Sequence, residues 1–111
     1  MNIRIGSVDY NLSYGEISDE IKKDLEAVEL AGYVDEKNSV IRISNGFNSN
    51  ISTQAFWHEV VHAMLFELGM DDLSSDEGFV DAFAKQIFIF HRDNNIGKIY
   101  EYVGDKKWLK S

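Results

Sequence analysis

The chain of 111 residues contains no cysteine and no proline. The lack of cysteine excludes disulfides and thiolate metal sites, so any metal ion must be held by His, Asp or Glu. The lack of proline leaves no rigid linker, and the length suits a single domain, 1–111. No apolar stretch approaches the roughly 20 residues that a membrane span needs, and no signal-peptide pattern opens the sequence. We therefore expect a cytoplasmic protein.

Basic residues are also scarce. Eleven Lys and Arg stand against 19 Asp and Glu, which gives a formal net charge of −8. A phosphate-binding surface needs an excess of positive charge, so this balance argues against a nucleic-acid partner and against docking on an anionic membrane. The content of 44% hydrophobic and 27% charged residues is typical of a soluble globular domain.

Apolar periodicity divides the chain into a strand-rich first part and a helical second part. Alternating and β-branched residues predict strands near residues 3–5, 8–14, 32–34 and 39–44. Between the second and third of these, Ile17, Ile21, Leu25 and Val28 form a helical stripe with Ser18 as N-cap, although residues 26–35 could instead be extended.

The second part of the chain is predicted to form three helices. A polar loop at 45–50 precedes a long apolar helix at 52–68, which Gly69 would end. An acidic connector at 70–75 leads to a helix at about 75–92, and a short helix follows at 96–103. The order predicts an α+β domain, in which a small N-terminal sheet packs on two central helices.

His58-Glu59-Val60-Val61-His62 is an H-E-x-x-H motif. Residues four apart lie on one face of a helix, so both imidazoles can bind one ion, for which zinc (Zn²⁺) is expected. Glu59 lies beside that pair, where it can take a proton from a water without being a ligand. Alternatively, both histidines are core residues and Glu59 lies at a surface edge. The apolar surroundings instead predict a buried helix, in which an unpaired Glu59 would be costly.

A catalytic zinc site takes three protein ligands and keeps one position open. The downstream carboxylates are Glu67, Asp71, Asp72, Asp76, Glu77 and Asp81. Glu67 is rotated away from the histidine face of its own helix. Glu77 opens the next helix, which the Gly69 turn folds back, and is therefore our predicted third ligand. His91 lies about 21 Å farther along that helix, too far to be a ligand.

Asp81 follows Glu77 by four residues and shares its helix face. It could accept the second ring N–H of a ligand histidine and so fix its tautomer. Both carboxylates have alternative roles. Residues 74–77 also match a capping box with Glu77 at N3, and Asp81 could pair with Lys85.

The motif, followed by Glu77-Gly78-Phe79-Val80-Asp81-Ala82-Phe83-Ala84, resembles the ImmA/IrrE-type zinc metallo-endopeptidases, zincin-like proteins of bacteria, phages and mobile elements. In that family a helix with Glu, then Asn or Asp, then Ala-x-Phe-Ala or similar follows the H-E-x-x-H helix. The resemblance implies Glu77 as the third zinc ligand. The Glu-x-x-x-Asp spacing is also similar to thermolysin-like gluzincins, where the second carboxylate orients a zinc-bound histidine, which matches Asp81.

The likeness covers roughly residues 32–92 and is greatest to short phage or prophage members of the family. It implies a zinc metallopeptidase, a hydrolase that acts on a peptide or protein, such as a regulatory protein. The substrate would lie as an added strand along residues 40–43, taken as the sheet edge. Tyr100, Tyr102, His91 and Arg92 are candidates for an oxyanion donor, although packing suits the tyrosines better.

Two other functions remain open on the sequence. A protein of phage or mobile-element origin could keep the zinc and bind a partner without cleaving it. A small helical scaffold without metal is the third reading.

Overall fold

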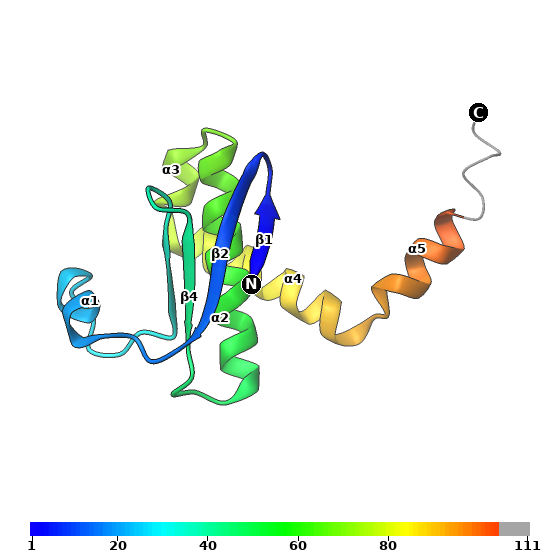
Figure 1. The fold of residues 1–111 in the computed structure, drawn as a ribbon. Helices are drawn as coiled ribbons and strands as arrows, with labels where there is room; N and C mark the ends of the chain where they lie inside the picture. Colours follow the sequence, from blue (N-terminus) through cyan, green and yellow to red (C-terminus); the bar gives the residue numbers. More distant parts are fainter. Residues whose placement is uncertain (105–111) are drawn as a thin grey trace.

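The computed structural model describes residues 1–104 and has an α+β fold with a four-stranded sheet (Figure 1). Along the chain, the elements are β1 (Asn2–Ile5), β2 (Val8–Gly15), α1 (Asp19–Asp24), β3 (Gly32–Asp35), β4 (Val40–Ser44), α2 (Ser49–Glu67), α3 (Asp71–Ser74), α4 (Glu77–Asp93) and α5 (Ile96–Gly104).

The sheet has the strand order β1-β2-β4-β3. β4 pairs in parallel with β2, with Ile41 opposite Leu12, and antiparallel with β3, with Ile41 opposite Val34. The expectation that residues 40–43 form the sheet edge is therefore wrong. The hairpin between β3 and β4 places β3 on the outside, because the other side of β4 is already taken by β2.

Helix α2 covers one face of the sheet (Figure 1). Alternate residues of the strands point toward it, and a core forms from Ile5, Tyr10, Ile41, Ile43, Ala55, Val60 and Ala63. Helix α4 packs on α2 through a second cluster of Val61, Leu65, Val80 and Ala84. The sheet was expected to pack on both central helices, and this expectation is met only in part. Helix α2 packs on the sheet, whereas α4 packs on the far side of α2.

The first helix is shorter than its apolar stripe predicts. Ser18 caps it as expected, since its Oγ accepts from the Ile21 amide at 3.2 Å. The helix ends at Asp24, and Glu26 has a φ of 54° in the left-handed region. Val28, the last residue of the stripe, is 94% exposed. The stripe fails beyond Asp24 because Val28 has no apolar surface to pack against. Of the extended alternative for residues 26–35, only 32–35 is a strand, and the residues before it form turns and bends.

Helix α2 begins inside the predicted polar loop. Asn48 is its N-cap, with the side chain accepting from the Ile51 amide at 2.9 Å. A capping Asn favours a helix start even among polar neighbours. Gly69 ends the helix as predicted, with a φ of 73°. The connector at 70–75 contains the short helix α3.

Helix α5 occupies the predicted stretch and has no buried residue. With the end of α4 it projects away from the sheet (Figure 1). Within residues 1–104, no helix combines the length and apolar character needed to cross a bilayer.

Candidate metal centre

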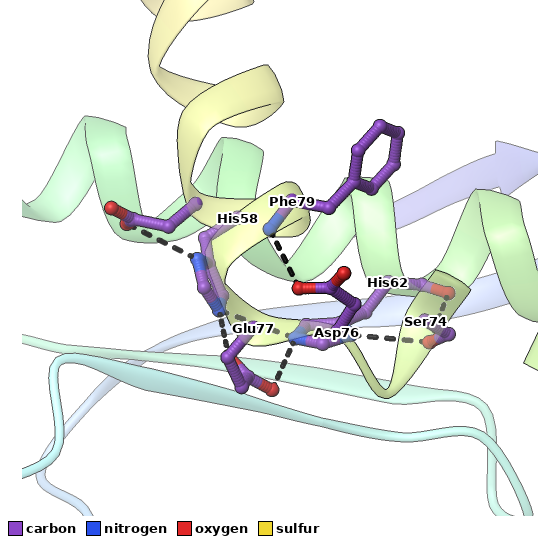
Figure 2. Close-up of polar contacts among 7 residues, drawn as sticks. His58, His62, Ser74, Asp76, Glu77 and Phe79 are labelled. Atoms are coloured by element: carbon purple, nitrogen blue, oxygen red, sulfur yellow. Dashed lines mark hydrogen bonds and ion pairs between the residues drawn. The ribbon is translucent and has the colours of Figure 1, made fainter. Parts of the chain in front are cut away.

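The structure brings His58, His62 and Glu77 together (Figure 2). The two histidines lie one turn apart on α2, and Glu77 is the first residue of α4. The Nε2 atoms of the two rings are 3.2 Å apart. The Glu77 carboxylate spans them, with Oε2 at 3.1 Å from His58 Nε2 and Oε1 at 3.1 Å from His62 Nε2.

The connector between α2 and α4 sets the position of Glu77. Gly69 reverses the chain and α3 follows at once, which makes a tight link. Asp76 then caps α4, because its Oδ1 accepts from the Phe79 amide at 3.0 Å (Figure 2). The predicted capping box is therefore wrong: Glu77 occupies the first helical position rather than N3. Its carboxylate is not used for capping and can reach the histidines.

The spacing of the three donor groups is compatible with a single metal ion. One ligand atom from each residue can be chosen so that all three lie within 4.8 Å of one another. The 3.2 Å between the two imidazole nitrogens is close to the roughly 3.3–3.4 Å between neighbouring tetrahedral donors at bonds of about 2.0–2.1 Å. A hydrogen bond between the rings would need a proton on one Nε2 only, and the carboxylate lies equally close to both. A cation satisfies all three groups at once. His58, His62 and Glu77 therefore form a group that could bind a metal ion.

The outer nitrogens of both rings face polar side chains. His62 Nδ1 lies 3.2 Å from Ser74 Oγ, and that hydroxyl donates to the His62 carbonyl at 3.4 Å. Because the Ser74 hydroxyl donates its proton to that carbonyl, its oxygen can only accept from the ring. His62 therefore carries its proton on Nδ1, and the lone pair of its Nε2 atom points toward His58 and Glu77. His58 Nδ1 lies 3.7 Å from Asp81 Oδ1, an ion-pair contact longer than a hydrogen bond.

Asp81 thus lies beside the His58 ring, but the distance is too long for the predicted hydrogen bond. The sequence assigned Ser74 only to a capping box. No spacing rule links Ser74 to His62, because their contact depends on the path of the connector.

Glu59 is buried, with 8% of its surface exposed, which contradicts the alternative of a surface edge. Burial, together with the smaller effect of the negative charges of Glu77 and Glu36, raises the pKa of its carboxyl to about 8. A hydrogen bond from the Val34 backbone acts in the opposite direction. Without a cation nearby, Glu59 is therefore held in its protonated form at neutral pH.

A groove runs past the cluster along β3. Two adjoining hollows of about 410 and 310 Å³ share Leu30, Gly32, His58 and Glu59 in their walls. The Ser44 amide donates to the Ala31 carbonyl at 2.8 Å. Because hydrogen-bonded pairs alternate along an antiparallel ladder, the backbone groups of Gly32 and Val34 point away from β4 and into this groove.

The remaining sequence candidates lie elsewhere. Glu67 accepts from the Ser7 backbone amide at 3.0 Å, so it ties the end of α2 to the β1–β2 turn. His91 lies at the end of α4 and stacks on Trp57 with 4.7 Å between ring centroids. Arg92 pairs with Asp93 at 2.9 Å.

Searches of protein-family models, curated proteins and solved structures find no match for this chain. The functional argument therefore depends on the residues of the site.

Proposed function

We propose that this protein is a zinc-dependent metallopeptidase in which His58, His62 and Glu77 hold the ion and Glu59 is the general base. The observation that carries the proposal is the donor triangle formed by the two imidazoles and the Glu77 carboxylate, with a buried carboxyl on the residue after His58. The two Nε2 atoms are 3.2 Å apart, and each lies 3.1 Å from a different oxygen of Glu77. Ligands of this type, two His and one Glu, are those of catalytic zinc sites with an open position.

Zinc bound there would supply Lewis acidity, which lowers the pKa of a water to about 7 and polarises a carbonyl. Glu59 would take a proton from that water and return it to the leaving amine. Its position supports this role. As the neighbour of His58 on α2, it lies beside the donor triangle, and the Val34 backbone orients its carboxyl.

The free edge of β3 is the proposed place for the substrate. The outward-facing backbone groups of Gly32 and the Val34 carbonyl can pair with an extended peptide, which would add a strand to the sheet. The Val34 amide is already used, since it donates to Glu59. The groove at that edge contains His58 and Glu59, so a peptide bond lying there would pass the donor triangle. This assignment moves the proposed substrate edge from residues 40–43 to β3.

Metal content is the first test. Purified protein should carry about one zinc per chain by mass spectrometry, and Glu77→Ala should lose most of it. Asp72→Ala is the matched control, because it removes an equal charge from exposed α3. Wild-type protein that stays empty with zinc supplied would contradict the proposal.

Cleavage is the second test, with a complex peptide mixture and sequencing of new N-termini. Zinc-loaded wild type should create new termini, and Glu59→Gln should create none while retaining its zinc. Identical termini from both proteins, each with one zinc, would favour the alternative of a zinc-binding protein of phage or mobile-element origin that binds a partner without cleavage.

A further inference from the structure

Helix α4 carries an exposed apolar face that the metal centre does not use. Phe79, Phe83 and Phe90 are 38%, 50% and 52% exposed. At 100° per residue they fall within about 40° of one another around the helix. Phe79 and Phe83 stack with 5.8 Å between centroids. Glu77 and Asp81 lie on a different side of the helix, turned toward His58, so the phenylalanines are not part of the site.

Helix α5 carries a second such face. Its apolar side chains Ile96, Ile99, Tyr100 and Val103 recur at helical spacing on one side. Tyr100 is 72% exposed and Val103 58%. Because α5 has no buried residue, its apolar side is not covered by the other described residues, 1–95.

The two faces meet at an elbow. Asn94 leaves the helical conformation, with φ −132° and ψ 147°, and the Asn95 side chain caps α5 by accepting from the Lys98 amide at 3.0 Å. The angle between the helices encloses a hollow of about 640 Å³, whose apolar lining is Ile87, Ile89, Phe90, Ile96, Ile99 and Tyr100. The arm, defined as residues 85–104, gives the chain a radius of gyration of 16.0 Å, against about 13 Å for a compact domain of this length.

Charge singles out the arm as a place where a second copy can approach. Residues 1–84 contain 5 basic and 16 acidic side chains, a net charge of −11. Within the arm, Lys85, Arg92 and Lys98 stand against Asp93 and Glu101, a net charge of +1. Two copies that met through residues 1–84 would repel each other, whereas two nearly neutral arms meet without that repulsion.

We propose that the arm is a dimerisation surface, in which α5 of each copy fills the elbow of the other. The pairing is antiparallel and two-fold symmetric, so it closes on itself. It places the end of one arm along the exposed phenylalanines of the other and keeps the acidic portions apart. The exposed apolar side chains of α4 and α5 offer roughly 600 Å² per copy. An interface of standard size takes about 800 Å² per partner with its polar rim.

The test is the mass of the intact chain in solution, by sedimentation equilibrium or light scattering from about 1 to 100 µM. The expected mass is twice the 12.7 kDa of one chain. Ile99→Glu and Phe90→Glu should each weaken the dimer at least about 100-fold, since each removes two buried side chains from a symmetric interface. Lys98→Gln is the control for Ile99→Glu, with an equal charge change on the opposite side of α5, and should leave the mass unchanged.

These substitutions do not touch the core, because Ile99 and Phe90 lie outside both buried clusters. Circular dichroism and zinc content should therefore remain those of wild type, which separates this proposal from the enzymatic one. If the wild-type protein is a monomer at every concentration tested, the proposal is wrong. This holds also if the arm then proves to bind a different protein or a membrane. An oligomer that survives both substitutions at the elbow overturns it as well.

Discussion

The buried carboxyl of Glu59 should make the metal-free protein less stable as pH rises, and Glu59→Gln should remove that dependence. Glu59 is 8% exposed, and its pKa is raised from an ordinary value of 4.5 to about 8. The unfolded chain releases this proton near pH 4.5, whereas the folded chain keeps it until about pH 8. Between these values the folded state binds more protons than the unfolded state, so the free energy of unfolding falls with increasing pH.

The size of the effect follows from the two pKa values. One pKa unit corresponds to about 1.36 kcal/mol, so the interval from 4.5 to about 8 amounts to about 5 kcal/mol when complete. The loss is absent below pH 4.5, reaches about 3 kcal/mol at pH 7 and is nearly complete above pH 8. Glutamine has similar size and stays neutral, so the variant should be more stable than wild type by about these amounts in the absence of metal.

The assay is urea unfolding of both proteins at pH 5, 7 and 8.5 in the presence of a chelator. Groups shared by the two proteins cancel in the difference between them, which isolates Glu59. We expect the difference to grow by about 4 kcal/mol from pH 5 to pH 8.5, with equal denaturant slopes. A difference that stays constant with pH would show that the carboxyl is ionised or hydrated in the folded metal-free protein, and the burial argument would be refuted.

Two further substitutions examine the surroundings of the site. Ser74→Ala should weaken zinc binding 10–100-fold, roughly the effect of losing an orienting partner of a ligand histidine; a competition titration with a chelator measures this, with the exposed neighbour Ser75→Ala as control. Val80→Ala should cost about 2–3 kcal/mol of unfolding free energy, because Val80 is 0% exposed between α2 and α4. Val28→Ala, at a residue that is 94% exposed, should change the unfolding free energy by less than about 0.5 kcal/mol. Similar losses in the Val80 and Val28 variants would contradict the packing of Val80 between the helices.

Local signals in the sequence predict much of this structure. The spacing of His58 and His62 requires only a helix, and the long apolar run supplies one. Ser18 and Gly69 act on their immediate neighbours, so their predicted roles as N-cap and helix end are found in the structure. The prediction of Glu77 depends on a more distant contact. After the chain reverses at Gly69, however, only a few positions allow a carboxylate to lie near the histidines.

The errors concern interactions between distant segments. β-branched residues identify β4 as a strand, yet they do not say which strands flank it, and the edge was assigned to the wrong one. Helix α1 has the correct cap but ends early, since its apolar spacing continues where the fold provides no surface. Ser74 meets His62 only because of the path of α3, and a capping motif offered a simpler local role.

The candidate metal centre lies at the junction of α2 and α4, which the apolar core already holds together. Val61 and Leu65 pack against Val80 and Ala84 just below the donor triangle, so α2 and the start of α4 are positioned without a metal ion. What the metal-free protein lacks is compensation for charge. The negative charge of Glu77 adds to the effect of burial and raises the cost of ionising Glu59. A divalent cation at the triangle would reverse this effect, because its charge favours the ionised form of Glu59. Metal binding should thus both strengthen the junction and convert Glu59 into the carboxylate that a general base requires.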